Sequence, residues 1–507
     1  MQHVELDEES ADAESVPPSP HRRRHRWIGA AVVAVALGVV GFQLLADARE
    51  RALLARLADV PGVLAPVDDR LPVAWRSDSA GELFWYKVAT RGSLVGPVVD
   101  DDGSQRLVAY DLSTGTQRWS TDLYGPDPAR ADAEADLGAS PPICLPTTDG
   151  PDPAQMACLA SDGFVRYGSD IAARVPASAS FVRVIDTADG RIVAQWPATG
   201  ATFTVVDGVA VLASYTDSYG AVTLDARDLR TGEPLWTDHE PAPAQTGSDN
   251  VTDWPPDVYR VAHLVAYADV VGHPVLFDVD GRRVHRETDH VAGTDLPGAQ
   301  VSVEPRSGRL VVSEWSDGSG YARTTVLDGD RPGYTFRGSP YAPVVDDGSA
   351  PGLMLYFAAD TRADASTAGV VLHGADVDTG APRWRSDLKV STDIPGAMIL
   401  RGRAFVLTRD GLAAVDTRSG RTLWSVDAPA GTMFGPPMTD GRQLLVSIQE
   451  PDDISPGDLV ALDPATGQQA WRKALPDGVD HVYPVGDVLL GLVENSDGRV
   501  QEVVRLG

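Results

Sequence analysis

The sequence predicts an all-β fold, a β-propeller, from its composition and from one short repeated motif. Its 507 residues include 49 glycines and 38 prolines, which favours short strands joined by frequent turns over long helices. In the motif, an apolar run ends in aspartate, a glycine follows within the turn, and the next strand carries an aromatic residue. Most copies lie 40 to 50 residues apart. That period is typical of the four-stranded blade of a propeller.

Five copies of the motif are clear and three are weaker. The clear copies share an aspartate, a glycine and a tryptophan: Asp111, Gly115 and Trp119; Asp228, Gly232 and Trp236; Asp378, Gly380 and Trp384; Asp416, Gly420 and Trp424; Asp463, Gly467 and Trp471. The weaker copies are Asp186 and Gly190 with Trp196 displaced by two residues, Asp278 and Gly281 with His285 in the aromatic place, and Asp328 and Gly333 with Phe336.

Each part of the motif has a physical reason. The aspartate side chain accepts hydrogen bonds from turn amides, and the glycine adopts the positive φ of a tight hairpin. The pair is expected to join the two outer strands of a blade. The tryptophan is expected to pack on the neighbouring blade, where burying a ring of this size stabilises the fold by up to about 4–6 kcal/mol.

The number of blades follows less directly from the repeat. We expect eight blades, within a range of seven to nine. Trp75 lacks an Asp–Gly turn of its own, so we expect its strand to complete the last blade together with Val500–Leu506. Counted strictly, that closure implies nine units.

The first two copies are separated by 75 residues, which indicates an insertion near Gly125–Ala160. Insertions between strands lie on a propeller face, where they either bind a partner or are surface loops that tolerate sequence change. Both cysteines, Cys144 and Cys158, fall in this segment. We expect a disulfide between them, worth about 3 kcal/mol by the loop-entropy estimate, with two unpaired thiols as the alternative.

The N-terminal region predicts a membrane anchor. Residues 1–26 form an acidic, Pro/Ser-containing tail with an arginine cluster (Arg22, Arg23, Arg24 and Arg26), expected to be disordered and cytoplasmic. Residues 27–46 carry no charge and are long enough to span a bilayer as a helix. Residues 47–69 are expected to form a juxtamembrane helix and linker, and residues 70–507 an extracytoplasmic propeller. A cleaved signal peptide is the alternative, since Ala46-Asp47-Ala48 satisfies the small-x-small rule.

The segment Ala461-Leu-Asp463-Pro-Ala-Thr-Gly467-Gln-Gln-Ala-Trp471 resembles the tryptophan-docking repeat of the pyrroloquinoline-quinone (PQQ) type of propeller. The resemblance covers about residues 70–507 and extends neither to WD40 nor to kelch repeats. Enzymes of that family hold PQQ and Ca²⁺ beneath a vicinal disulfide, with Glu and Asn as calcium ligands. The two cysteines here are not adjacent, and Asn250 and Asn495 lie in no matching context. The resemblance therefore implies a degenerate, non-enzymatic bacterial member without cofactor, metal or catalytic residues.

Two acidic runs, Asp100-Asp101-Asp102-Gly103 and Asp346-Asp347-Gly348, lack the spaced ligands of a calcium loop and are predicted to be hairpin turns. The formal net charge of −29 argues against nucleic-acid binding. The sequence thus favours a non-catalytic recognition or scaffold propeller, tethered to the cell membrane and binding protein partners of the cell envelope. An atypical PQQ-dependent dehydrogenase and a ligand-binding sensor ectodomain remain alternatives.

Overall fold

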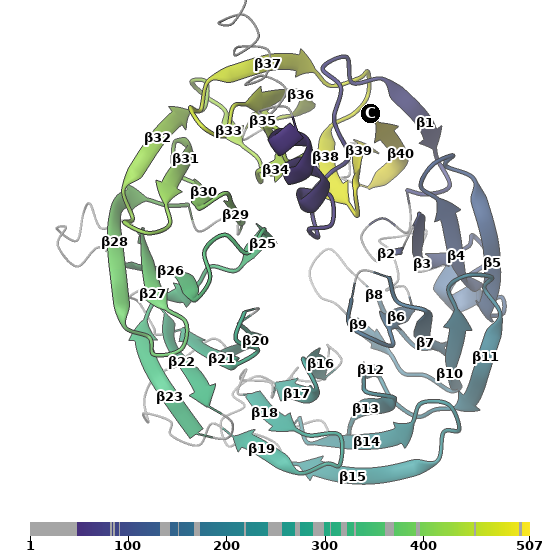
Figure 1. Cartoon of the computed structure of the whole chain (residues 1–507). Helices are drawn as coiled ribbons and strands as arrows, with labels where there is room; N and C mark the ends of the chain where they lie inside the picture. The colour runs from purple at the N-terminus through teal and green to yellow at the C-terminus, as the bar shows by residue number, and fades with distance from the viewer. Residues whose placement is uncertain are drawn as a thin grey trace, which may run out of the picture. The chain divides into compact units, whose positions relative to one another are not determined.

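The computed structural model describes residues 48–81, 84, 87–90, 92–131, 142–150, 152–166, 173–216, 220–241, 256–268, 274–286, 299–304, 306–315, 322–328, 331–359, 370–391, 396–450, 453–495 and 499–507. Residues 58–507 form one compact unit. Within the described residues this unit contains nine sheets of the propeller type, arranged as a ring (Figure 1). Their strands pair antiparallel except for β25 (Pro343–Asp346) and β29 (Ala397–Leu400), which pair in parallel. We number these blades in chain order.

The strands of the first five blades are as follows. Blade 1 has β2 (Val88–Thr90), β3 (Ser93–Val99), β4 (Gln105–Asp111) and β5 (Gln117–Tyr124); blade 2 has β6 (Ile143–Pro146), β7 (Gln155–Ser161), β10 (Ser180–Asp186) and β11 (Ile192–Pro197); blade 3 has β12 (Thr202–Val206), β13 (Val209–Tyr215), β14 (Val222–Asp228) and β15 (Pro234–Glu240); blade 4 has β16 (Asp257–Val261), β17 (Leu264–Ala268), β18 (Pro274–Phe277) and β19 (Arg283–Arg286); blade 5 has β20 (Ala299–Val303), β21 (Leu310–Trp315), β22 (Ala322–Asp328) and β23 (Arg331–Arg337).

The last four blades include three irregular ones, since blade 6 has a first strand of two residues and blades 7 and 8 have five strands each. Blade 6 has β24 (Ser339–Pro340), β26 (Leu353–Ala359), β27 (Val370–Asp376) and β28 (Pro382–Lys389); blade 7 has β25 (Pro343–Asp346), β29 (Ala397–Leu400), β30 (Arg403–Leu407), β31 (Gly411–Asp416) and β32 (Thr422–Asp427); blade 8 has β33 (Met433–Phe434), β34 (Met438–Thr439), β35 (Leu444–Glu450), β36 (Asp453–Leu462) and β37 (Gln469–Ala474); blade 9 has β38 (His481–Val485), β39 (Val488–Glu494), β40 (Val500–Leu506) and β1 (Val73–Ser77).

Strand β1 closes the ring. It pairs antiparallel with β40, and Trp75 lies opposite Arg505 in the register. The predicted role of the Trp75 strand is confirmed. The ring has nine blades, which lies within the expected range of seven to nine but differs from the preferred number of eight. The difference arises because all three weak copies of the motif are blades and the closing sheet adds a ninth.

The predicted insertion at Gly125–Ala160 is only partly correct. The connection 125–142 lies within the predicted range, but residues 143–161 hold β6 and β7, which are the first two strands of blade 2. The other additional residues lie in the segment 162–179, which contains a hairpin of β8 (Phe164–Arg166) and β9 (Ala173–Val175). The spacing of the aspartate and tryptophan residues could not locate these strands, because the motif lies on the two outer strands of a blade and a first strand such as β6 carries no motif residue.

In seven of the blades an aromatic residue docks on the turn of the next blade. The Trp119 indole donates a hydrogen bond to the carbonyl of Thr187 (3.1 Å), one residue after the turn aspartate Asp186. The same bond joins six further blade pairs: Trp75 to Leu112, Trp196 to Leu229, Trp236 to Val279, Tyr334 to Val377, Trp384 to Thr417 and Trp424 to Pro464. Trp471 packs, partly buried, on the core that blades 8 and 9 share. The side chain of His285 lies outside the described residues.

The turn itself is built to receive that ring. The carboxylate of Asp228 accepts hydrogen bonds from the backbone N–H groups of Arg230 (3.0 Å) and Thr231 (2.8 Å). The bonds from Thr231 hold the pKa of Asp228 below its ordinary value. Gly232 has φ +74°, and a Cβ added there would lie 2.6 Å from the Trp196 ring. Glycine is thus required both by the backbone conformation and by the close approach of the indole.

Two expected motif residues need correction. In blade 6 the turn aspartate is Asp376 and not Asp378, because the Asp376 carboxylate accepts the N–H groups of Asp378 and Thr379. In blade 5 the docking ring is Tyr334 and not Phe336. Phe336 packs within the apolar cluster around Met354 and Tyr356 instead. Tyr334 lies six residues after Asp328, whereas the tryptophan of four clear copies lies eight residues after the aspartate. Spacing alone therefore selects Phe336.

The alanine that precedes the turn aspartate by two residues lies directly across from the tryptophan. Ala109 pairs with Trp119, Ala226 with Trp236 and Ala461 with Trp471. Trp196, displaced by two residues, pairs with Val182 further along the strand. A shift of two residues keeps a side chain on the same face of the sheet, so this indole still reaches the next blade.

The segment that precedes β1 is part of the compact unit from residue 58 onward. The N–H of Leu64 donates to the carbonyl of Thr439 (2.8 Å) in blade 8, and that of Ala65 donates to Asp487 (2.7 Å) in blade 9. Leu64, Val67 and Leu71 are buried in the core of these blades. Residues 48–57 are helical. The predicted tail and span, residues 1–46, lie outside the described residues, among which no helix is long and apolar enough to cross a membrane.

We predict that a methyl group at a docking glycine costs more stability than one at an open turn. Gly420→Ala should lower the unfolding free energy by about 1–2 kcal/mol for its positive φ and by about 1–3 kcal/mol more for overpacking against Trp384. The matched control is Gly208→Ala, which has φ +82° with nothing within 4 Å of the new Cβ. Denaturation of residues 58–507 by urea measures both. Equal losses in the two variants would contradict the docking role.

Candidate functional site

The two faces of the ring differ in their connections. Antiparallel strands alternate in direction, so the turns between the first and second and between the third and fourth strands share one face, here called the short-turn face. The remaining connections share the other, the long-connection face. The strand ends joined by residues 125–142, 162–179, 241–256 and 287–298 all lie on the long-connection face. Apart from residues 341–352, which contain β25, the longest short-turn connection is 147–154. The room for recognition loops is therefore on one face.

The two cysteines lie in the core and not on a recognition loop. Cys144 and Cys158 are direct partners in the register of β6 and β7 and form a disulfide, with a Cα–Cα distance of 4.1 Å. Both are buried in an apolar cluster that also contains Leu107 and Leu123 of blade 1. The disulfide therefore lies in the seam between blades 1 and 2, where its effect is on stability.

The first acidic run is a hairpin turn between β3 and β4, as predicted. The second is not a hairpin turn, because Asp346 ends β25 and the chain continues from there to β26, which belongs to a different sheet. Asp100 forms an ion pair with Arg106, and its carbonyl accepts the N–H of Gly103 (2.8 Å). The Asp347 carboxylate accepts the N–H groups of Ser349 (2.9 Å) and Arg401 (2.7 Å). Within the described part of the chain, no three His, Cys, Asp or Glu side chains come together as metal ligands. That the chain works without PQQ or Ca²⁺ stays a prediction.

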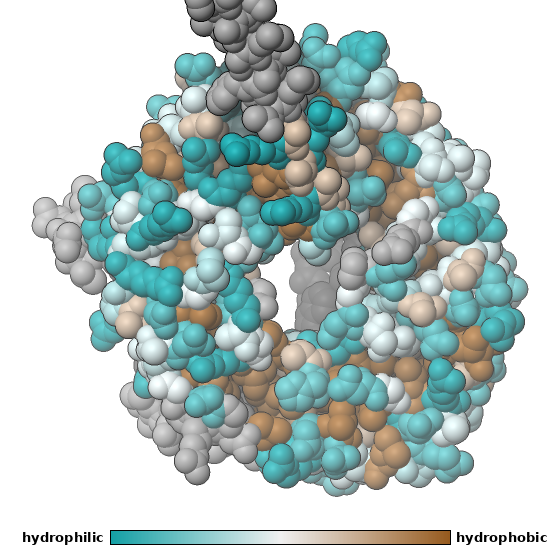
Figure 2. All heavy atoms as spheres, in the orientation of Figure 1, coloured by the Kyte–Doolittle hydropathy of each residue, from teal (hydrophilic) through white to brown (hydrophobic). Residues whose placement is uncertain are grey.

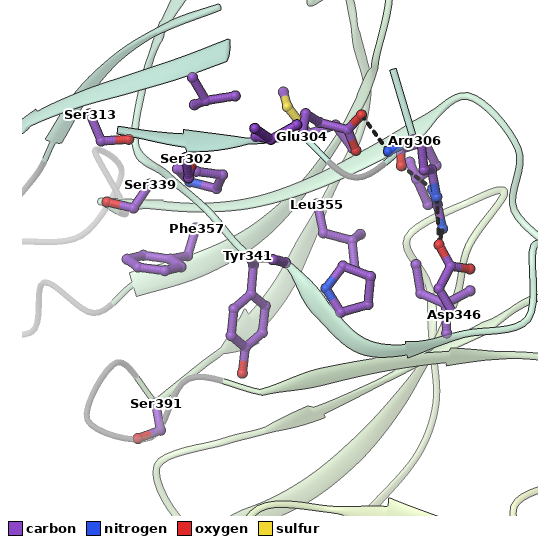
Figure 3. A pocket seen from close by; sticks show the side chains of 18 residues that line it. Ser302, Glu304, Arg306, Ser313, Ser339, Tyr341, Asp346, Leu355, Phe357 and Ser391 are labelled. Carbon is purple, nitrogen blue, oxygen red and sulfur yellow. Dashed lines mark hydrogen bonds and ion pairs between the residues drawn. The ribbon is translucent and has the colours of Figure 1, made fainter. Parts of the chain in front are cut away.

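A cavity of about 390 Å³ lies between blades 5 and 6 (Figure 3). Its walls come from the inner strands β20, β21 and β26, from β24 and β25, and from Ile399 of blade 7. Most of the lining is apolar and includes Val311, Leu355 and Phe357. Tyr341 packs edge-on against Phe357 at a centroid distance of 5.8 Å. Burial raises the pKa of Tyr341 to about 12, so its phenol stays protonated and donates to the Gly396 carbonyl (3.0 Å).

One end of this cavity carries three charged side chains that form hydrogen bonds within the protein. Arg306 donates through Nε to the Asp346 carboxylate (2.7 Å) and through Nη1 to the carbonyls of Ala350 (2.8 Å) and Leu353. The Glu304 carboxylate accepts the backbone N–H groups of Arg306 (3.0 Å) and Ser307 (2.6 Å). These groups brace the junction of blades 5, 6 and 7. The Arg306 guanidinium is thus paired with the Asp346 carboxylate, whereas the partners of the Glu304 carboxylate are backbone N–H groups.

Sequence reasoning missed this cavity. It depends on β25, which leaves blade 6 and pairs in parallel with β29 of blade 7. Parallel pairing of a strand with the neighbouring blade does not change the spacing of the repeated motif, so that spacing cannot reveal it. The one available signal was Glu304-Pro-Arg306-Ser-Gly308, a turn of the Asp–Gly type placed after the first strand of its blade.

Lys87 is a lysine whose pKa is lowered by burial. Its Nζ donates to the Phe84 carbonyl (2.8 Å) and lies 3.2 Å from the centroid of the Phe84 ring. Phe84 in turn packs on Tyr483 of blade 9 at 5.5 Å. Burial lowers the pKa of Lys87 to about 8. The lysine therefore belongs to the seam that closes the ring, between blades 9 and 1.

The fold defines a closed β-propeller in which an aromatic side chain of one blade docks on the turn of the next blade. A family model described as outer membrane protein assembly factor BamB matches residues 367–475 and 412–504. The described residues therefore form a β-propeller, and residues 367–504 match repeats of this PQQ-like type. No curated protein matches the sequence.

Several solved structures are similar to the chain. BamB from Moraxella catarrhalis is 17% identical, with 69% of this chain and 95% of that chain covered and a TM-score of 0.36. Quinohemoprotein alcohol dehydrogenase from Comamonas testosteroni is 14% identical, covers 88% and 78%, and has a TM-score of 0.40. A europium-containing methanol dehydrogenase is 10% identical, covers 87% and 91%, and has a TM-score of 0.37. These values carry no information on activity or partner.

We predict that Lys87 makes stability depend on pH in a defined window. Its folded-state pKa of about 8 lies below the ordinary 10.5, so between these values the unfolded chain binds more protons. Stability therefore rises with pH across this window and is lowest, for this group, below pH 8. Lys87→Met should raise the melting temperature at pH 7.5, and the gain should vanish by pH 10.5. The exposed Lys473→Met is the control, and a gain for Lys87→Met that is equal at both pH values would refute the assignment.

Proposed function

We propose that the protein is a non-catalytic scaffold of the cell envelope, tethered to the membrane by residues 27–46, whose propeller binds a protein partner outside the membrane. The observation that carries this proposal is the difference between the two faces. On the short-turn face the Asp–Gly turns are occupied by the docking aromatics of the neighbouring blades, and the segment from Leu64 to Leu71 is bound at blades 8 and 9. The partner is therefore assigned to the long-connection face.

Two further observations support a protein partner. The matched family model is described as an assembly factor, which is a binding role and not a catalytic one. The visible face of the ring is covered mainly by hydrophilic side chains, with apolar ones in small separate groups (Figure 2). The net charge of −29 favours a basic partner surface.

Photocrosslinking in the native cell tests the face assignment. A photoreactive phenylalanine analogue placed at Arg409 or Asp102, on the long-connection face, should give a protein adduct. The matched positions are Arg418 in blade 7 and Thr114 in blade 1, both exposed on the short-turn face. We expect several-fold weaker adducts from these. Adducts that form only from Arg418 and Thr114 would reverse the proposal.

Reconstitution tests the absence of quinoprotein activity. Residues 58–507, incubated with PQQ and Ca²⁺, should show the absorbance of free PQQ and should not reduce an artificial electron acceptor in the presence of primary alcohols. The reason is that the described residues bring no three acidic, histidine or cysteine side chains together as metal ligands. A shifted absorbance band with dye reduction would establish the dehydrogenase instead.

A further inference from the structure

The cavity between blades 5 and 6 exists because blade 6 lacks most of its inner strand. Strand β24 pairs with β26 only at Ser339–Phe357 and Pro340–Tyr356. The chain then leaves for blade 7 as β25, whereas β26 continues back to Leu353. The inner edge of β26 at Leu353–Leu355 is thus left without a neighbouring strand and faces the cavity (Figure 3).

This edge is nevertheless closed to an added strand. The carbonyl of Leu355 accepts the N–H of Tyr341 (2.9 Å), and the carbonyl of Leu353 accepts Nη1 of Arg306. A peptide that added to β26 would need both acceptors for its own ladder. The occupant of the space is therefore a small molecule and not an extended segment of a partner. Its volume of about 390 Å³ lies within the ~300–1,000 Å³ that small-molecule sites span.

The lining selects an uncharged ligand. The single cationic group at the wall, Arg306, is neutralised by Asp346 at 2.6 Å from Nη2 and is also bound to two carbonyls. An anionic ligand would have to break this pair or lose its own hydration without a partner, and both are costly in a buried site. A cationic ligand would have to compete with Arg306 for the Asp346 carboxylate, or with the backbone N–H groups of Arg306 and Ser307 for the Glu304 carboxylate.

The remaining polar groups at the wall are hydroxyls. Ser302, Ser339 and Ser391 line the cavity, and no described residue forms a hydrogen bond with their side chains. Ser313 differs, since its hydroxyl is paired with Thr324 (3.0 Å). The three hydroxyls come from strands of blades 5 and 6 and from the connection to blade 7. They provide donors and acceptors for an uncharged polar group on an otherwise apolar molecule.

We propose that the cavity between blades 5 and 6 is a binding site for an uncharged, mainly apolar small molecule that carries one or two hydrogen-bonding groups. This site lies in the interior of a seam and does not depend on the partner surface of the proposed scaffold. A ligand there contacts β20, β26 and β25 at once, so it links three successive blades.

Two fluorescent probes with the same ring system test the proposal on residues 58–507, the compact unit that contains every strand of the ring. N-phenyl-1-naphthylamine is uncharged, and 1-anilinonaphthalene-8-sulfonate adds one sulfonate. We expect saturable fluorescence enhancement with the uncharged probe at one site, and at least about tenfold weaker binding of the sulfonate, which corresponds to about 1.4 kcal/mol. No saturable binding of the uncharged probe, or equal affinity for both probes, would overturn the assignment.

Two substitutions that fill the space locate the binding. Leu355→Trp on β26 and Ser302→Phe on β20 project larger rings from opposite walls, and each should weaken binding of the uncharged probe at least tenfold. The matched control, Leu235→Trp, changes a leucine that is 52% exposed on β15 and should leave the affinity within twofold of the original. Because two walls are tested independently, a misfolded variant, recognised by its melting temperature, does not remove the test. Unchanged affinity in a folded filling variant would overturn the site.

Discussion

The structure depends on one repeated contact, in which the aromatic ring of one blade lies on the glycine turn of the next and donates a hydrogen bond to its backbone. A single blade has no core of its own, because its apolar side chains face the neighbouring sheets. The buried clusters accordingly contain residues of successive blades, as in the cluster that joins Val211 of blade 3 to Val265 of blade 4. The indole supplies burial and a directed bond at the same time, which fixes the distance and register between blades. Trp75 applies the same contact across the junction of the two ends of the ring.

This contact also explains how functions are distributed over the molecule. The turns that receive the rings are short and occupied, so the short-turn face has little freedom to vary. Connections between the strand ends on the opposite face receive no docking ring, so they tolerate long segments such as 125–142 and 241–256. The disulfide lies inside a seam and strengthens the junction of blades 1 and 2. Stability and recognition thus occupy different parts of each blade.

Blade 6 departs from this regular arrangement. Strand β25 contributes its hydrogen bonds to blade 7, and the Arg306–Asp346 pair ties it back to blade 5. The three blades are thereby linked more closely than by ring docking alone, and a cavity remains where an inner strand would lie. An apolar space of this size has a cost in packing, because its lining loses contacts that a side chain would supply. A ligand that fills it would restore them.

The sequence alone determined the local elements: the Asp–Gly hairpins, the ring that lies four residues beyond the glycine in each clear copy, and the strand that closes the circle. These features depend on hydrogen bonds and φ angles within a few residues, which Asp228, Gly232 and Trp236 specify by type and spacing. Only the tertiary structure decided that nine blades close the ring, that Tyr334 docks in place of Phe336, that the cysteines lie in a seam, and that β25 crosses to blade 7. Each of these is settled by contacts between residues far apart in the chain, where packing selects among several locally acceptable arrangements, and no periodic pattern records that selection.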